Sequence, residues 1–280
     1  MNDDFAVFIL THGRPTNVIT LRTLKNCGYT GKIFLIIDDE DKKADDYFKL
    51  YGQEMVIQFD KKKYADECDE CNNFDERRTI TMARNACFDI AKILGLTYFM
   101  QLDDDYTQFK FRFTNKLGYE AKIKSIDRVF NSFIEFYKST LILSLAFSQG
   151  GDHIGGFTQT KLKRKCMNSF LCSTDRPFKF VGAMNEDVNT YTTLGSRGNI
   201  FFTFTSVQLD QKPTQSQVGG ISDMYLKYGT YCKAFTTVMN MPSSVKISML
   251  HSSNPRVHHA ISWGNTVPKI ISEEFKKQLT

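Results

Sequence analysis

Short apolar runs alternate with helix-patterned segments through the first 60 residues, and this rhythm constrains the fold more than any other feature. Each run stops at polar residues, as a buried strand does, and the segments between carry apolar residues at helical spacing. A strand–helix–strand–helix–strand order predicts a parallel sheet with helices on its faces. The expected strands are Phe5–Leu10, Lys32–Ile37 and Glu54–Phe59, and the expected helices are Thr16–Asn26 and Asp45–Tyr51.

The pattern continues along the chain with additions, and no internal repeat or low-complexity linker interrupts it. We therefore expect an α/β fold with a mostly parallel central sheet flanked by helices, in a single domain over residues 1–280. The further elements expected are helices over Thr79–Leu94, Ser125–Ser144 and Glu186–Leu194 and strands over Tyr98–Leu102, Phe109–Phe113 and Ile200–Val207.

The composition excludes disordered and membrane-spanning chains. With 41% hydrophobic residues, 24 Phe and 12 Tyr, the chain can bury a large core. No apolar run approaches the roughly 18 residues of a membrane span. The acidic start is unlike a signal peptide, and an odd number of cysteines, seven, suits a reducing compartment. We expect a cytoplasmic protein without a membrane partner, in which Cys68 and Cys71, a single CxxC pair, are free thiols.

The charge is distributed unevenly. Residues 1–105 hold 14 Lys and Arg against 20 Asp and Glu, a net charge of −6. Residues 106–280 hold 22 against 11, a net charge of +11. A basic half suits a polyanionic partner such as nucleic acid, although it also serves solubility.

Three consecutive acids, Asp103, Asp104 and Asp105, follow the strand over Tyr98–Leu102 directly. Open α/β sheets bind ligands at the carboxyl ends of their strands. Neighbouring carboxylates repel each other, and a cation relieves the repulsion. Oxygen ligands of this kind suit Mg²⁺ or Mn²⁺ holding a diphosphate, whereas the alternative is a solvated acidic turn.

Further polar residues are expected at the same edge of the sheet. Asp38 and Asp39 end the second strand and could bond a ribose hydroxyl or a base N–H. The first strand ends in the sequence THGRP, in which Arg14 could pair with a phosphate. Arg84, on the helix before the three acids, could balance them or a diphosphate, and a surface arginine is the alternative.

A second acidic pair, Glu186 and Asp187, stands at the expected start of a helix. The pair could stabilise the helix end by its charge. Alternatively, one of the two could act as a general base beside an acceptor. Of the five histidines, His251 and His258 are candidates to fold over a metal held by the three acids.

These residues, taken in order, resemble a family of glycosyltransferases with the GT-A fold. The resemblance rests on THGRP after the first strand, IIDDED after the second, the Arg-Asn helix, the strand into DDD and the distant NEDV. The sequence is most similar to the TET-associated glycosyltransferases of bacteriophages. The similarity covers residues 5–105 well and residues 180–207 moderately.

The resemblance implies a UDP-sugar donor, a divalent metal (Mn²⁺ or Mg²⁺) and an acceptor, 5-hydroxymethylcytosine in phage DNA. It implies that residues 1–105 bind the nucleotide-sugar and that residues 106–280 bind the acceptor. It also implies roles for individual residues: Thr11, His12, Arg14, Asp38 and Asp39 at the nucleotide, Arg84 and Asp104 near the donor, Asp103 and Asp105 at the metal, and Asp187 as catalytic base with Glu186 anchoring the helix.

The basic half then has an interpretation. We expect Lys161, Lys163, Arg164 and Lys165 to lie on a mobile loop that grips the DNA backbone, and a solvated loop is the alternative. Three other functions compete: a GT-A enzyme acting on a protein or glycan, a nucleotidyltransferase, and a non-catalytic DNA-binding module. A nucleotidyltransferase usually has a longer glycine-rich loop after its first strand, and a binding module would leave the acids without a role.

Overall fold

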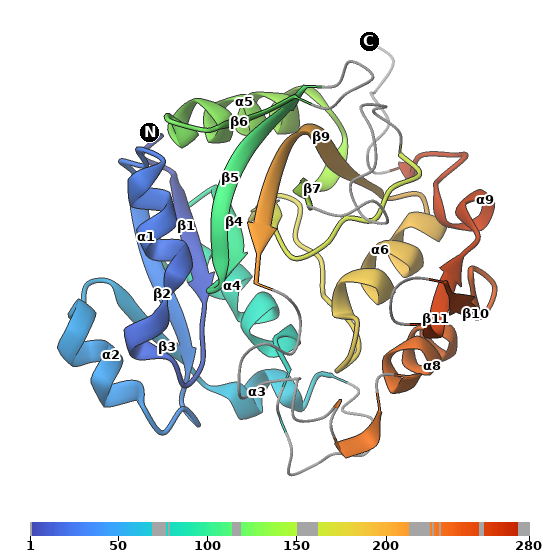
Figure 1. Cartoon of the computed structure of the whole chain (residues 1–280), viewed down its shortest axis with the longest axis horizontal. Coiled ribbons are helices and arrows are strands. Elements are labelled where there is room, and N and C mark those ends of the chain that lie inside the picture. Colours follow the sequence, from blue (N-terminus) through green and yellow to red (C-terminus); the bar gives the residue numbers. More distant parts are fainter. Residues whose placement is uncertain are drawn as a thin grey trace.

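The computed structural model describes residues 2–68, 77, 79–113, 119–149, 162–212, 225, 227–229, 231–251 and 255–273. Its centre is a nine-stranded sheet in the order β3-β2-β1-β4-β8-β7-β9-β5-β6, and β10 and β11 form a separate antiparallel pair (Figure 1). The strands are β1 Phe5–Leu10, β2 Lys32–Asp38, β3 Val56–Phe59, β4 Tyr98–Asp103, β5 Tyr106–Phe113, β6 Tyr119–Lys122, β7 Ile142–Gln149, β8 Phe170–Ser173, β9 Ile200–Gln211, β10 Val245–Leu250 and β11 Arg256–Ile261.

Strands β3, β2, β1 and β4 are parallel, as the sequence predicted. Beyond them the sheet is mixed. Strand β8 is antiparallel to both of its neighbours, β4 and β7, whereas β7 and β9 run parallel. The second part of the chain therefore joins its strands directly to the parallel half of the sheet, and the expected α/β class is confirmed.

Helices cover both faces of the sheet. Helices α1, α2 and α5 contribute buried residues to the core on one face, and α3, α4 and α6 to the core on the other. Strand β1 is buried at every position and sends alternate side chains into the two cores, which explains why it reads as an unbroken apolar run. The helices are α1 Ile19–Asn26, α2 Ala44–Tyr51, α3 Lys61–Ala65, α4 Thr81–Ile93, α5 Ile126–Ser139, α6 Glu186–Ser196, α8 Tyr231–Asn240 and α9 Trp263–Thr266.

The structure differs from the expected elements at the end of one helix and near the end of the chain. The helical pattern over Ser125–Ser144 ends at Ser139, and Ile142–Gln149 forms the fully buried strand β7 instead. Helix α8 and the pair β10–β11 were not predicted; α8 packs on α6 and on β11.

No helix within the described residues is long and apolar enough to cross a membrane. Cys27, Cys87, Cys166, Cys172 and Cys232 are free thiols. Cys71 lies outside the described residues, so the expectation for Cys68 and Cys71 stays a prediction.

Candidate active site

The carboxyl ends of β1, β2 and β4 lie side by side and bring the predicted acids together. In the parallel ladder, Leu10 at the end of β1 is the partner of Asp103 at the end of β4. Strand β2 pairs with the opposite side of β1 and ends at Asp38. The sheet therefore brings together the acids that the sequence predicted at one edge.

Asp104 is buried. Its Oδ2 accepts a hydrogen bond from the Thr11 hydroxyl at 2.7 Å, and its Oδ1 lies 3.1 Å from Nη1 of Arg14. Tyr47 of α2 completes the group, because its hydroxyl contacts Thr11 and accepts from the backbone N–H of Arg14. Burial raises the pKa of Asp104, and Arg14 opposes the shift. Asp104 thus fastens the segment after β1 to the turn after β4.

Asp103 and Asp105, on either side of Asp104 in the sequence, are partly exposed. The backbone around them is fixed, because Thr20 of α1 donates its hydroxyl to the carbonyl of Asp103 and its N–H to the carbonyl of Asp104. Burial, reinforced by neighbouring carboxylates, raises the pKa of Asp103 to about 7 and that of Asp105 to about 6. A group of carboxylates that resists carrying all its charges is one that a divalent cation would stabilise.

The donor set fits Mg²⁺ or Mn²⁺ only in part. Among the described residues, no three Asp, Glu, His or Cys side chains gather closely enough to hold a metal. Two hard carboxylates can still suffice, since Mg²⁺ commonly binds one or two carboxylates and takes its other ligands from water and substrate phosphates. Asp103 and Asp105 are the residues that would hold it.

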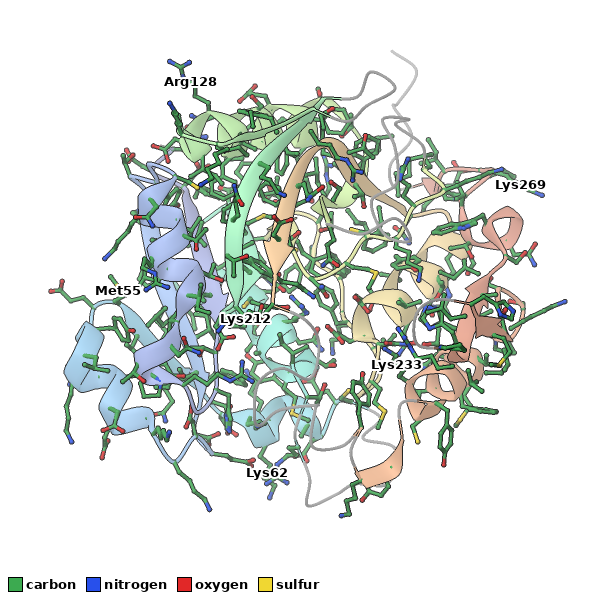
Figure 2. The ribbon with its side chains drawn as sticks, in the orientation of Figure 1. Met55, Lys62, Arg128, Lys212, Lys233 and Lys269 are labelled. Atoms are coloured by element: carbon green, nitrogen blue, oxygen red, sulfur yellow. The ribbon has the colours of Figure 1, made fainter. Side chains whose placement is uncertain are left out.

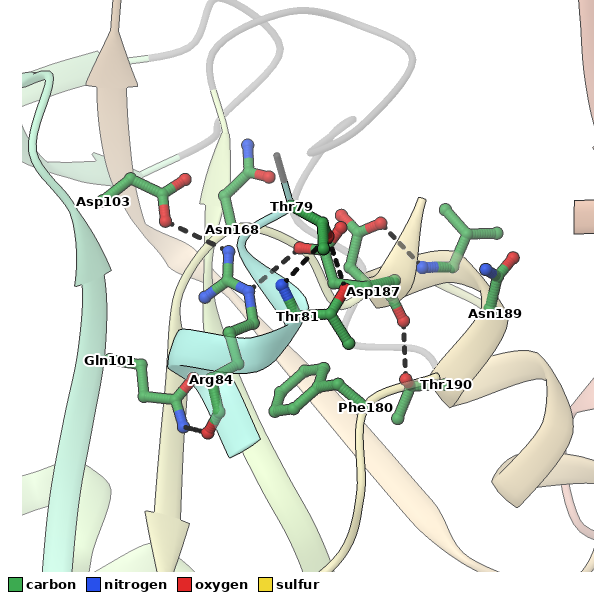
Figure 3. Close-up of polar contacts among 12 residues, drawn as sticks. Thr79, Thr81, Arg84, Gln101, Asp103, Asn168, Phe180, Asp187, Asn189 and Thr190 are labelled. Atoms are coloured by element: carbon green, nitrogen blue, oxygen red, sulfur yellow. Dashed lines mark hydrogen bonds and ion pairs between the residues drawn. The ribbon is translucent and has the colours of Figure 1, made fainter. Parts of the chain in front are cut away.

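Arg84 of α4 connects Asp103 to Glu186 at the start of α6 (Figure 3). Its side chain is 1% exposed; Nη2 lies 3.0 Å from Oδ1 of Asp103, and Nε lies 2.9 Å from Oε1 of Glu186. The guanidinium also lies 4.9 Å from the ring centroid of Phe170 and 5.7 Å from that of Phe180. Burial alone would lower the pKa of Arg84, but the two carboxylates raise it instead. We call Arg84, Asp103 and Glu186 the Arg84 centre.

Several hydrogen bonds hold the Arg84 centre together. Gln101 of β4 donates to the backbone carbonyl of Arg84, and Thr81 donates to the carbonyl of Gly182. Asn85 both donates to the carbonyl of Phe180 and accepts from its N–H. Helix α4 is therefore fastened to the segment that leads into α6, and Arg84 is an enclosed partner of the acids rather than a surface arginine.

Asp187 differs sharply from its neighbour Glu186. It is buried and makes no ion pair with Arg84; its Oδ1 accepts a 2.7 Å hydrogen bond from the N–H of Val188. Burial raises the pKa of Asp187, and the charge of Glu186 raises it further. The two acids of the predicted pair therefore have separate surroundings, with Glu186 bound to Arg84 and Asp187 not.

The segment after β1 is fixed by a second network, around Asp38. Nδ1 of His12 lies 2.6 Å from Oδ2 of Asp38, and the buried ammonium of Lys61 lies 3.2 Å from Oδ1. The hydrogen bond to Asp38 raises the pKa of His12. Burial would raise the pKa of Asp38, but His12 and Lys61 together lower it. Asp39 is exposed, and its Oδ1 accepts from the N–H of Lys61.

The histidines expected at the metal lie elsewhere. His251 is exposed just beyond the end of β10, and His258 lies on β11 with its ring 4.1 Å from that of His259. Neither joins Asp103 and Asp105 in a metal-binding group among the residues that the structure describes. This expectation from sequence is therefore not met: position near the end of the chain did not bring either histidine to the acids.

The basic segment is only partly a solvated loop. Lys161 lies outside the described residues, and Lys163 is exposed. Arg164 and Lys165 are partly buried, and Nζ of Lys165 lies 3.5 Å from Nε2 of His259. The segment turns inward as it approaches the buried Cys166. The expected contact of these four residues with the DNA backbone stays a prediction.

Sequence reasoning missed Tyr47, Lys61, His259 and Lys233. Each meets the site only through a long-range contact, for example Tyr47 with Thr11 or Lys61 with Asp38. Nothing in the local sequence distinguishes Tyr47, Lys61 and Lys233 from other tyrosines and lysines. His259 has only the adjacent His258 to mark it.

No protein of curated function matches the sequence. The solved structure of TarS 1–349 from S. aureus is similar at 10% identity and a TM-score of 0.47, and the match covers 85% of this chain and 65% of the solved TarS chain. Glucosyl-3-phosphoglycerate synthase from Mycobacterium tuberculosis, in complex with Mn²⁺, UDP and phosphoglyceric acid, is similar at 9% identity and a TM-score of 0.49, over 92% of this chain and 86% of that one.

The family comparison covers most of the chain. Residues 5–220 match the model of the TET-associated glycosyltransferases, and this range includes the segment after β1, the three acids, Arg84 and the Glu186–Asp187 pair. The chain therefore belongs to the TET-associated glycosyltransferase family.

Proposed function

We propose that this protein is a divalent-metal-dependent enzyme that transfers a sugar from a UDP-sugar to the hydroxymethyl group of 5-hydroxymethylcytosine in DNA. The observation that carries the proposal is the Arg84 centre. One buried guanidinium binds both Asp103, beside the expected donor site, and Glu186, the neighbour of the expected base. A donor and an acceptor hydroxyl bound at these two clusters would meet at one place.

The site residues divide the work of transfer. The nucleotide would be bound by Thr11, Arg14 and Asp39. Hydrogen bonds to Asp104 and Asp38 hold the segment after β1 rigid, and Asp39 accepts a hydrogen bond from the N–H of Lys61. A metal at Asp103 and Asp105 would stabilise the charge that develops on the diphosphate leaving group. Arg84 would hold Asp103 and the start of α6 in place while that charge develops.

Asp187 would take the proton from the acceptor hydroxyl. A general base works best when its pKa lies near the working pH, and burial raises the pKa of Asp187 in that direction. The hydroxyl oxygen then attacks the anomeric carbon from the face opposite the diphosphate, which inverts the configuration. A base stacked in a duplex would have to leave the helix to reach Asp187. We propose that the reaction takes place in the cytoplasm of a phage-infected host.

Labelled UDP-sugars, Mn²⁺ and DNA with or without 5-hydroxymethylcytosine provide the test. We expect label to enter only the hydroxymethylated DNA, and EDTA to abolish the reaction. Asp105→Ala should remove transfer while the circular dichroism spectrum stays unchanged, because the side chain is partly exposed. The matched control is Asp45→Ala, at an exposed position on α2.

Three outcomes would contradict parts of the proposal. Transfer at full rate in EDTA would exclude the metal. Donor hydrolysis with no DNA product would favour a protein or glycan acceptor. DNA binding without turnover of any nucleotide-sugar would favour a binding module.

A further inference from the structure

Two lysines lie partly buried near the start of α6, and neither ammonium has an acidic partner within 4 Å in the part of the chain that the structure describes. Lys165 precedes β8, and its Nζ contacts only His259. Lys233 belongs to α8 (Figure 2), and its Nζ lies 5.4 Å from the ring centroid of Tyr225. Half-buried ammonium groups are normally paired, because removing their water costs free energy.

The surroundings of the two lysines are positive. Burial lowers the pKa of both side chains; Lys233 lowers that of Lys165 further, and Arg256 lowers that of Lys233 further. Only Asp187 acts on both in the opposite direction. His259 adds no charge, because burial and the nearby cations lower its pKa to about 2. The cluster therefore carries more positive charge than Asp187 can balance.

The scaffold around the lysines is fixed. Asn185, with a left-handed backbone (φ 54°), places its amide nitrogen 3.0 Å from the carbonyl of Lys233, 3.0 Å from the Thr237 hydroxyl and 3.3 Å from Nδ1 of His259. One side chain thus joins the start of α6 to α8 and β11. The backbone of Lys233 is therefore fixed before any ligand arrives, which reduces the entropy that binding costs.

The wider charge pattern favours a nucleic-acid strand as the source of the missing anion. Described residues from Tyr225 onward carry five cations and a single acid, Glu273. The five cations are Lys227, Lys233, Lys246, Arg256 and Lys269. This region lies beyond the residues that match the family, so Lys233 belongs to a part of the chain that the family match does not include.

We propose that Lys165 and Lys233 form a phosphate-binding subsite that holds a phosphodiester of the acceptor DNA strand beside Asp187. Assigning this subsite to the acceptor strand rather than to the donor rests on the proposed function and on the position of the two lysines around Asp187. The expected donor site is instead linked to Glu186 by Arg84. The subsite would anchor the backbone next to the target nucleotide and so present its hydroxymethyl group to the base.

The test compares Lys165→Gln, Lys233→Gln and the double variant with Lys49→Gln, which removes one exposed lysine from α2. Fluorescence anisotropy would give DNA affinity as a function of salt, and calorimetry would give UDP-sugar affinity. Removing one lysine–phosphate interaction should lower the slope of log K against log salt by about 1, so the slope of the double variant should fall by about 2. Lys233→Arg should keep the wild-type slope, and UDP-sugar affinity should not change.

The outcomes are separable from those of the transfer assay, because DNA binding is measured without turnover. An unchanged salt slope in the double variant, or a wild-type protein that does not bind DNA, would overturn the proposal. Weaker UDP-sugar binding with unchanged DNA binding would assign the lysines to the donor diphosphate instead. Removing an unpaired ammonium should leave the melting temperature unchanged or higher, and a large fall would show that the lysines are structural.

Discussion

The Arg84 centre and the surroundings of Asp187 are neighbours, yet their charges are arranged in opposite ways. In the Arg84 centre each acid has a cationic partner within hydrogen-bonding distance. Around Asp187 the carboxylate and the two lysines exert charge on one another but form no ion pair. Paired charges build a rigid frame, whereas charges left without a close partner are available to a substrate.

The adjacent acids Asp187 and Glu186 offer the sharpest comparison of the two regions. Asp187→Asn should lower the transfer rate by about 10²–10⁴-fold, the usual cost of losing a general base, while UDP-sugar binding is kept. Glu186→Gln retains an oxygen that can accept from Nε of Arg84, so it should stay active and lose about 1–3 kcal/mol of stability. Single-turnover rates and urea denaturation measure the two effects. The assignment fails if Asp187→Asn transfers sugar within a few-fold of the wild type.

Replacing Arg84 should damage the frame. Arg84→Gln leaves Asp103 and Glu186 close together without their shared cation, and breaking a buried ion pair costs about 3–5 kcal/mol. We expect a correspondingly lower midpoint in urea denaturation. Arg22→Gln, which removes an exposed arginine of α1, is the control and should change the midpoint little. Equal stability in both variants would show that Arg84 is not a structural partner of the acids.

The smallest effect should come from the contact between His12 and Asp38, because the His12 side chain is 48% exposed. The pKa of His12 is raised in the folded protein, so its stabilising contribution is complete below an unfolded pKa of about 6.5 and is lost as the pH rises through the folded value. The pKa of Asp38 is lowered, so its contribution is lost in acid, as the pH falls through the folded value.

Urea midpoints of the wild type and of His12→Gln should therefore differ most below a pH of about 6.5 and converge as the pH rises through the raised pKa of His12. His251→Gln, at an exposed histidine, should show no such convergence. A difference that grows with pH would mean that His12 interacts mainly in its neutral form.

The parallel half of the fold could be predicted from the sequence because its strands are buried on both faces. Phe5–Leu10 is apolar throughout, Tyr98–Leu102 is apolar except for Gln101, and both runs end at polar residues. Strand β10 carries no such signal, since most of its positions are exposed, and β8 has only four residues. The boundary between α5 and β7 was missed because the apolar residues of β7 follow α5 closely and extend its apolar pattern. The sequence alone therefore does not show where the helix ends.

The candidate site divides in the same way. The ends of the predicted strands were enough to place Asp38 and Asp103 at one edge of the sheet, because this inference needs only the order of the elements. The partners of Arg84 lie 19 and 102 positions away in sequence, and the contact between Lys165 and His259 spans 94. Local pattern carries no information about such contacts, so the sequence indicated the reactive groups but not which of them are neutralised.

Strand β8 has a practical consequence for dissecting the protein. It lies against β4, so the strand that flanks the N-terminal parallel strands comes from the part of the chain after residue 105. A fragment that stops at residue 105 would expose the edge of β4, including Phe99 and Met100, and bare edges of this kind recruit other chains into aggregates. Donor binding should therefore be studied in the intact chain, and a split version would need both pieces expressed together.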